Sequence, residues 1–143
     1  RQMCIRDSAS TQIPVLFAPN TSSGIAILKN ILNTSKNLFS KDHVFSISET
    51  HHIEKKDSPS GTALDLKRAI ISIYPEANVV IESFREGNNP GEHTVSITLD
   101  KEIIEFTHRA EDRSIFALGA LKGASWLTER SPGLYSMSDI YSS

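Results

Sequence analysis

Groups that can transfer protons and bind anions gather between Glu49 and Thr62. This segment holds adjacent histidines at 51 and 52, lysines at 55 and 56, carboxylates and a Pro-Ser-Gly-Thr turn. Imidazoles exchange protons near neutral pH, lysines supply positive charge, and the first turn of a helix offers free backbone N–H groups. A small anionic substrate that must be protonated would use all three, so we interpret this segment as a candidate site.

His51 and His52 end an expected strand, where neighbouring side chains point to opposite sides. They are therefore poor partners for one metal ion. Neither a cysteine cluster nor a His-Glu-x-x-His helix accompanies them, so we predict no metal. Two interpretations remain open. Either both are loop histidines satisfied by hydrogen bonds, or one transfers a proton while Glu49, two residues before His51, orients its ring and favours its charged form.

Lys55 and the turn at 59–62 each have a structural and a functional interpretation. Lys55 is either a solvated surface lysine or an ammonium group that binds a substrate carboxylate or protonates a carbanion. Ser60 caps a helix in either case, yet the other N–H groups of the first turn, near Gly61 and Thr62, can still attract an anion. The sequence leaves both pairs of interpretations open.

The composition is that of an ordinary globular domain, with 143 residues, 38% hydrophobic residues and a net charge of -2. This balance gives no indication of a nucleic-acid surface or of binding to an anionic membrane. The apolar runs are too short to span a bilayer. Cys4 is the only cysteine, which excludes an internal disulfide and fits a reducing compartment, so we expect a cytoplasmic protein.

Apolar periodicity predicts roughly five strands and three helices in the order β-α-β-α-β-β-β-α. The strands are expected at 13–18, 44–50, 79–84, 93–99 and 104–108, and the helices at 25–39, 63–73 and 116–127. From residue 44 onward this order predicts an α+β fold, a mainly antiparallel or mixed four-stranded sheet with helices on one face. Residues 1–12 show no pattern and are expected to be a disordered or non-native leader.

The candidate segment fills the pattern Glu-x-His-His-x-x-Lys-x-Asp-x-Pro-Ser-Gly-Thr-Ala without a gap from Glu49 to Ala63. Further matches are Ala18-Pro19-Asn20, Arg85-Glu86-Gly87, Gly91-Glu92-His93-Thr94, Thr107-His108-Arg109-Ala110 and Pro132-Gly133-Leu134-Tyr135. Over about residues 13–140, the chain resembles the 4-hydroxy-tetrahydrodipicolinate reductases, long called dihydrodipicolinate reductases, of the bacterial and plant lysine/diaminopimelate pathway.

The resemblance implies an oxidoreductase that transfers a hydride from NADH or NADPH to a cyclic imine dicarboxylate, with protonation of the neighbouring carbon and loss of water. By position, His51 resembles the family's general acid/base and Lys55 its second proton donor. His52, Gly61 and Thr62 resemble the residues that hold the substrate's carboxylates. Positive charge and helix-end N–H groups suit this chemistry, because they stabilise charge that moves onto the ring.

The same resemblance places Ala18, Pro19, Asn20 and Thr21 on the turn that contacts the nicotinamide end of the cofactor. Thr21 departs from the aromatic residue often found there. The Gly-rich turn of dinucleotide-binding domains, G-x-G-x-x-G, does not occur in the sequence. We therefore expect a C-terminal fragment, inactive alone, in which residues 13–43 are a remnant strand and helix of a Rossmann-type α/β domain. The sequence does not decide between NADH and NADPH.

The rest of the chain is assigned by the same resemblance. Residues 44–130 are expected to form the substrate-binding and oligomerisation domain, and residues 131–143 a tail that docks on the remnant. The resemblance also implies a homotetramer. Two other classes of function remain open: a non-catalytic domain that binds dicarboxylates or self-assembles, and a zinc hydrolase, which would retain stoichiometric metal after dialysis.

Overall fold

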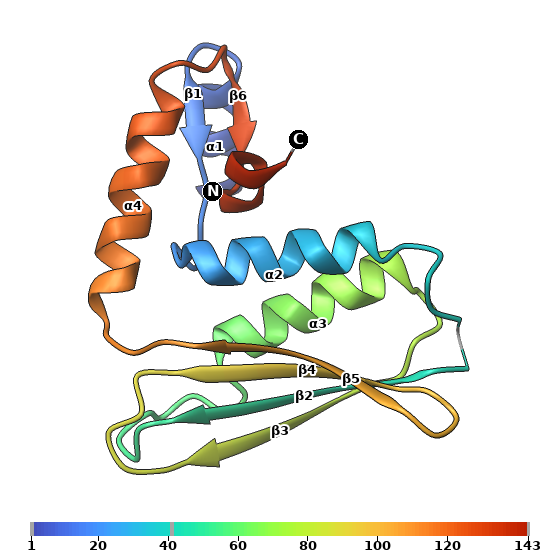
Figure 1. The fold of residues 1–143 in the computed structure, drawn as a ribbon. Coiled ribbons are helices and arrows are strands. Elements are labelled where there is room, and N and C mark those ends of the chain that lie inside the picture. The colour runs from blue at the N-terminus through green and yellow to red at the C-terminus, as the bar shows by residue number, and fades with distance from the viewer. Residues whose placement is uncertain (1, 41, 143) are drawn as a thin grey trace. The chain divides into compact units, whose positions relative to one another are not determined.

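The computed structural model describes residues 2–40 and 42–142 and separates into two compact units, Arg1–Asn30 with Arg113–Ser143, and Ile31–Asp112 (Figure 1). The elements in chain order are α1 (Gln2–Ser10), β1 (Pro14–Leu16), α2 (Ser23–Thr34), β2 (Val44–His51), α3 (Gly61–Ile73), β3 (Val79–Arg85), β4 (Glu92–Thr98), β5 (Ile103–Arg109), α4 (Ser114–Leu127), β6 (Gly133–Tyr135) and the 3₁₀ helix η1 (Met137–Tyr141). None of the helices in the described ranges has the length and hydropathy needed to cross a bilayer.

The unit Ile31–Asp112 is built on a four-stranded sheet with the strand order β3-β2-β4-β5 (Figure 1). β2 runs parallel to β3 and antiparallel to β4, which pairs antiparallel with β5, so the sheet is mixed. Helix α3 contacts β2 and β3. The apolar side chains that α3 and the strands bury are Phe45, Ile47, Ala63, Leu66, Ile70, Val79, Val95 and Ile97. The predicted α+β class with a mixed four-stranded sheet is confirmed.

Strand β2 buries every second side chain. Phe45 and Ile47 lie in the core, and the same alternation continues through Glu49 to His51 at the end of the strand. Successive side chains of a strand point to opposite faces, so these four share one face. The strand therefore carries polar groups into the interior at its carboxyl end.

Helix α3 has the predicted cap and the predicted end, although it begins at Gly61, before the expected residue 63. Ser60 is its N-cap, and the Ser60 hydroxyl accepts a hydrogen bond from Ala63 N at 3.1 Å. The helix ends at Ile73, ahead of Pro75, which cannot continue the hydrogen-bond pattern. The cap thereby fixes the point at which the loop 52–60 ends and α3 begins.

Helix α2 ends at Thr34, so the expected extension to residue 39 was wrong. The Tyr74 hydroxyl donates to Ser35 O at 2.5 Å, and Asn37 adopts a left-handed backbone with φ 78°. Phe39 then packs edge-on against Tyr74, with ring centroids 6.3 Å apart. The apolar residues beyond Thr34 thus serve tertiary packing, which helical periodicity alone does not distinguish from a longer helix.

In the other unit, β1 and β6 pair in parallel, with Pro14 opposite Gly133. β6 lies within the expected tail 131–143, and β1 within 13–43. Helix α4 contacts β1 closely, since a Cβ added at Gly123 would lie 2.6 Å from Leu16 Cδ2. Glycine at this position allows the helix backbone to approach the strand.

Residues 2–10 are helical, which corrects the expectation of disorder over this part of the segment 1–12. Helix α1 contacts both β1 and β6. The Arg6 guanidinium also lies over the Phe17 ring, 3.9 Å from its centroid, as in a cation–π contact. The contact with β6 joins distant parts of the chain, and a local sequence pattern does not reveal it.

Candidate functional site

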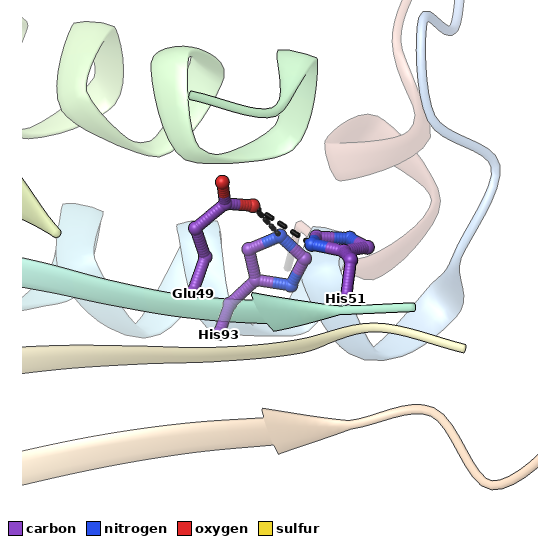
Figure 2. A group of neighbouring side chains, drawn as sticks. All are labelled: Glu49, His51 and His93. Atoms are coloured by element: carbon purple, nitrogen blue, oxygen red, sulfur yellow. Dashed lines mark ion pairs between the residues drawn. The ribbon is translucent and has the colours of Figure 1, made fainter. Parts of the chain in front are cut away.

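Glu49 and His51 meet at the buried carboxyl end of β2 (Figure 2). His51 Nδ1 lies 2.8 Å from Glu49 Oε2, although the two atoms lack the alignment of a hydrogen bond. The side chains of His51 and Glu49 are only 9% and 0% exposed. Screening by water is therefore weak, and the carboxylate acts strongly on the ring.

The Glu49 carboxylate is surrounded by donors. Its Oε1 accepts hydrogen bonds from Ser60 N at 3.0 Å and from Arg85 Nη2 at 3.2 Å. Burial by itself raises the pKa of Glu49, but hydrogen bonds from Ser60 and Ser83 and the charge of His51 outweigh it and hold the pKa below its ordinary value. Glu49 is therefore ionised at neutral pH.

His51 has a pKa below its ordinary value. Burial is the largest cause, and the positive charges of Lys55 and Arg85 lower it further, whereas Glu49 and Asp57 raise it. The sequence predicted that Glu49 favours the charged form. Glu49 acts in that direction, but burial outweighs it. His51 is thus neutral at neutral pH, and the carboxylate favours the tautomer with its proton on Nδ1.

Gly91 leaves room for the other ring nitrogen of His51. An added Cβ at Gly91 would lie 3.0 Å from His51 Nε2. The residue also has a φ of 147°, a conformation that L side chains rarely adopt. Glycine at this position therefore allows this backbone conformation and leaves room for the His51 imidazole.

We expect Gly91→Ala to lower the free energy of unfolding by about 1–3 kcal/mol, because the new methyl group combines backbone strain with a contact on His51. Urea unfolding measures this loss, and the NMR signals of the His51 ring should shift. Gly87→Ala is the matched control: Gly87 has a φ of 50°, but an added Cβ meets no described atom within 4 Å. Equal changes of the His51 signals in both variants would contradict the role of Gly91.

His93 is the site residue whose importance the sequence did not reveal. It lies opposite Glu49 in the β2–β4 register, with its Nε2 3.2 Å from Ser60 Oγ and 3.9 Å from Glu49 Oε2. Its ring meets that of His51 edge-on at a centroid distance of 5.0 Å. Burial, and after it the charge of His51, lower the pKa of His93 to about 4. His93 is therefore a neutral imidazole throughout the physiological range.

We expect the stability of the chain to fall between pH 6.5 and about 4, in part because of His93. Its ordinary pKa is 6.5 and its pKa in the fold is about 4, so over this interval the unfolded chain takes up the proton and the folded chain does not. The shift corresponds to roughly 3 kcal/mol, fully available above pH 6.5 and lost as the pH falls. Urea unfolding against pH should show a shallower slope in His93→Gln; an identical slope would contradict the burial of a neutral His93.

Glu49, His51 and His93 could together coordinate a metal ion, since their ligand atoms lie within 4.8 Å of one another. The sequence argument against a metal considered only His51 and His52, and the structure brings His93 from another strand instead. Two cations, Arg85 and Lys55, act on the same cluster and disfavour a further positive charge. We therefore interpret the group as an acid–base cluster, and the absence of stoichiometric metal after dialysis remains a prediction.

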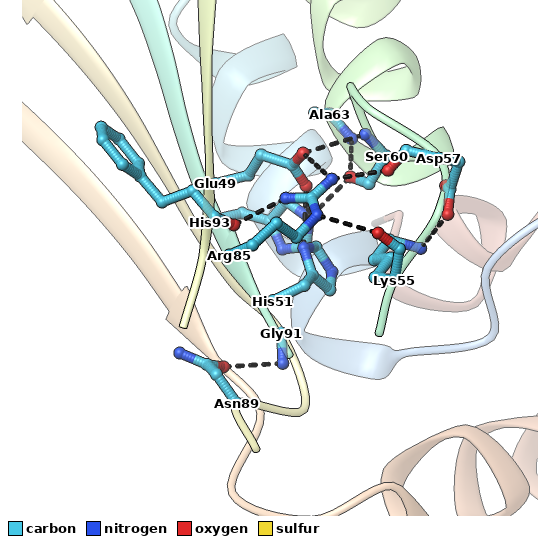
Figure 3. Close-up of polar contacts among 11 residues, drawn as sticks. Glu49, His51, Lys55, Asp57, Ser60, Ala63, Arg85, Asn89, Gly91 and His93 are labelled. Carbon is cyan, nitrogen blue, oxygen red and sulfur yellow. Dashed lines mark hydrogen bonds and ion pairs between the residues drawn. The ribbon is translucent and has the colours of Figure 1, made fainter. Parts of the chain in front are cut away.

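Lys55 pairs with the carboxylate of Asp57 in the loop that precedes α3 (Figure 3). Lys55 Nζ lies 2.7 Å from Asp57 Oδ1, and the side chain of Lys55 is 22% exposed. The hydrogen bond from Lys55 is the main reason that the pKa of Asp57 is lowered, and the backbone N–H of Gly61 adds to it. His52 and Thr62 are half-buried and Gly61 is exposed. The structure thus places Lys55 on a carboxylate in the loop just before α3, and an anion site that includes Gly61 remains a prediction.

The predicted cofactor residues belong to the other unit, in the turn between β1 and α2. Asn20 Oδ1 accepts from Ser22 N at 2.7 Å, and Thr21 Oγ1 donates to Phe116 O at 2.7 Å. Ala18 is half-buried and Pro19 is exposed. The turn is therefore held by α4 and by its own side chains, at the carboxyl end of a parallel strand, where α/β sheets commonly bind ligands.

A family model described as "Dihydrodipicolinate reductase, C-terminus" matches residues 24–141. The 4-hydroxy-tetrahydrodipicolinate reductase of Buchnera aphidicola subsp. Cinara cedri is 39% identical over 97% of this chain and 58% of its own length. That of Hahella chejuensis is 36% identical over 98% of this chain and 60% of its own length. The chain therefore spans about three fifths of these relatives.

The fold is also similar to that of a solved structure, the dipicolinate-bound dihydrodipicolinate reductase from Paenisporosarcina sp. TG-14. The TM-score is 0.80 at 19% sequence identity, over 97% of this chain and 59% of that one. At this identity the comparison establishes a shared fold.

Proposed function

The chain belongs to the dihydrodipicolinate reductase family, and we propose that it binds 4-hydroxy-tetrahydrodipicolinate and acts in its reduction to tetrahydrodipicolinate with loss of water. This is a step of lysine and diaminopimelate biosynthesis. The observation that carries the proposal is the pair of Lys55 with the Asp57 carboxylate, in the loop that follows the buried Glu49–His51 pair. Further support comes from the Buchnera aphidicola and Hahella chejuensis relatives, both of which are named 4-hydroxy-tetrahydrodipicolinate reductase.

The substrate's carboxylates would take the place that Asp57 now shares with Lys55 and Gly61. Gly61 and Thr62 lie in the first turn of α3, where backbone donors and the helix dipole favour an anion. His52 would add a second point of contact. Support comes from the dipicolinate-bound reductase of Paenisporosarcina sp. TG-14, since dipicolinate is a planar ring with two carboxylates.

His51 would exchange a proton with the ring carbon next to the reduced one, and Lys55 would be the second donor. In the free chain burial keeps His51 neutral. A bound dianion adds negative charge beside the imidazole and raises its pKa, so substrate binding itself would help to charge the acid. Glu49 stays ionised and stabilises the imidazolium.

The cofactor would be NADH or NADPH, which supplies the hydride. The turn Ala18–Thr21 fits a nicotinamide contact by its place after a parallel strand, with Pro19 exposed toward solvent. We assign residues 44–130 to substrate binding and assembly, 13–43 to the dinucleotide-binding side and 131–143 to the tail that pairs with it.

We also propose a homotetramer that acts in the cytoplasm. Strands β3 and β5 are the edges of the four-stranded sheet. Phe84 on β3 is 51% exposed and Ile103 on β5 is 63% exposed. Edges that carry exposed apolar side chains favour association with another copy.

We expect the chain to be inactive alone, so the test is a turnover assay of the chain joined to the amino-terminal part of a full-length relative, with 4-hydroxy-tetrahydrodipicolinate and either NADH or NADPH, followed by nicotinamide absorbance. Calorimetry with dipicolinate runs in parallel. Turnover supports the proposed reaction. Dipicolinate binding without turnover would instead favour a non-catalytic dicarboxylate-binding domain, and the absence of both would contradict the proposal.

A further inference from the structure

The Arg85 side chain reaches the loop that carries Lys55 (Figure 3). Arg85 Nε donates to the Lys55 carbonyl at 3.3 Å, and Nη2 donates to the Asp57 carbonyl at 2.5 Å. These carbonyls flank Lys56, whose own side chain is exposed. One guanidinium therefore fixes the backbone on both sides of the loop's centre.

The same guanidinium also contacts the carboxylate beside His51. Arg85 Nη2 lies 3.2 Å from Glu49 Oε1, while Glu49 Oε2 lies 2.8 Å from His51 Nδ1. On β3, Arg85 stands opposite His51 in the parallel register with β2. Its Nη1 donates to the Phe84 carbonyl at 2.6 Å, which restrains the side chain itself.

A lysine could not make these contacts together. The guanidinium is planar and presents five donors in a fixed arrangement, whereas an ammonium group is a single flexible point charge. The Arg85 side chain is only 19% exposed, so its hydrogen bonds face little competition from water. Arginine at this position thus combines two loop carbonyls, a strand carbonyl and a buried carboxylate.

We propose that Arg85 is a positioning residue that sets Lys55 and the Glu49–His51 pair in one fixed arrangement. The inference rests on the proposed function, in which Lys55 and His51 are the two proton donors. Arg85 acts through these groups and does not itself touch the substrate. Loss of its planar donor set should release the loop from the end of β2 and weaken the binding of a dicarboxylate, and loss of its charge should in addition change the pKa of His51.

Charge and geometry can be separated by two substitutions. The charged or titratable groups that face His51 come from β2, the loop, β3 and β4, and are Glu49, Lys55, Asp57, Arg85 and His93. Arg85→Lys keeps the positive charge and loses the planar donor set. Arg85→Gln loses both. We expect the His51 pKa to change little in Arg85→Lys and to rise in Arg85→Gln, since a positive charge that lowers it has been removed.

The experiment combines NMR titration of His51, amide hydrogen exchange of residues 53–58 and calorimetry with dipicolinate. Both Arg85 variants should exchange the loop amides at least about 10-fold faster than the unsubstituted chain. Dipicolinate affinity should fall about 10-fold in Arg85→Lys. When Arg85→Lys is added to Lys55→Gln, the further loss of dipicolinate affinity should be much smaller than the loss that Arg85→Lys causes alone. Both substitutions disable the Lys55 ammonium group, so their effects should not add.

Arg109→Lys is the matched control, since Arg109 pairs with Glu92 on the same sheet but is 66% exposed. Arg109→Lys should change neither the hydrogen exchange of the loop amides nor the dipicolinate affinity. Added to Lys55→Gln, it should leave the loss of affinity as it is in Lys55→Gln alone. Unchanged loop exchange in both Arg85 variants, or additive losses with Lys55→Gln, would overturn the inference. If the unsubstituted chain does not bind dipicolinate, the proposed function fails, and the exchange and the His51 titration still decide the role of Arg85.

Discussion

Replacing His51 by Gln lowers kcat by about 10²–10⁴-fold in the proposed reaction, because Gln preserves polarity but cannot transfer a proton. The affinity for dipicolinate should change little, since the carboxylate site that we propose is formed by Lys55 and the start of α3. Steady-state kinetics of the proposed reduction measure the first effect, and calorimetry measures the second. This pattern is that of a group whose contribution is made in the transition state.

Two other histidines supply controls. His52→Gln should mainly raise KM, because His52 is proposed to hold the substrate. His43→Gln should leave both constants unchanged, since His43 lies before β2 and accepts a hydrogen bond from Ser40 N. An unchanged kcat in His51→Gln, with the chain still folded, would reject the proton-transfer role.

Replacing Glu49 by Ala should cost about 3 kcal/mol of unfolding free energy, because it leaves Arg85 and Ser60 N without their buried acceptor. It should also lower the pKa of His51 further, since the carboxylate is the main group that raises it. Urea unfolding and NMR titration of His51 test the two effects. Glu49→Gln keeps the acceptor and should lose less stability than Glu49→Ala.

Glu92→Ala is the control for this loss. Glu92 pairs with Arg109 at 2.6 Å on the same sheet, but the Arg109 side chain is 66% exposed. Exposed ion pairs contribute about 0–1 kcal/mol, so a small change is expected. If Glu49→Ala were as stable as Glu92→Ala, Glu49 would not have the central role in the cluster that we assign to it.

The half of the site that depends on local structure could be predicted from the sequence. Glu49 and His51 share a face because strands alternate, and Ser60 caps α3 because a hydroxyl follows a proline before an apolar periodic segment. The mixed sheet followed from the order of its elements. Each of these inferences needs only a few neighbouring residues.

The other half depends on how strands pair. His93 and Arg85 reach Glu49 across β4 and β3, and no local pattern gives the register that puts them there. The signal that could have identified His93 is its place on the buried side of an alternating strand. Helix α1 and the early end of α2 were missed for the same reason, since tertiary contacts determine both.

The most direct test is an NMR titration of the isotopically labelled chain with dipicolinate. We expect saturable shifts at the amides of Gly61 and Thr62 and at the side chains of His51, His52 and Lys55, together with a rise in the His51 pKa as the dianion binds. A titration that leaves these groups unshifted, or moves only signals elsewhere, would contradict the claim that an acid–base pair and a carboxylate site act on one ring.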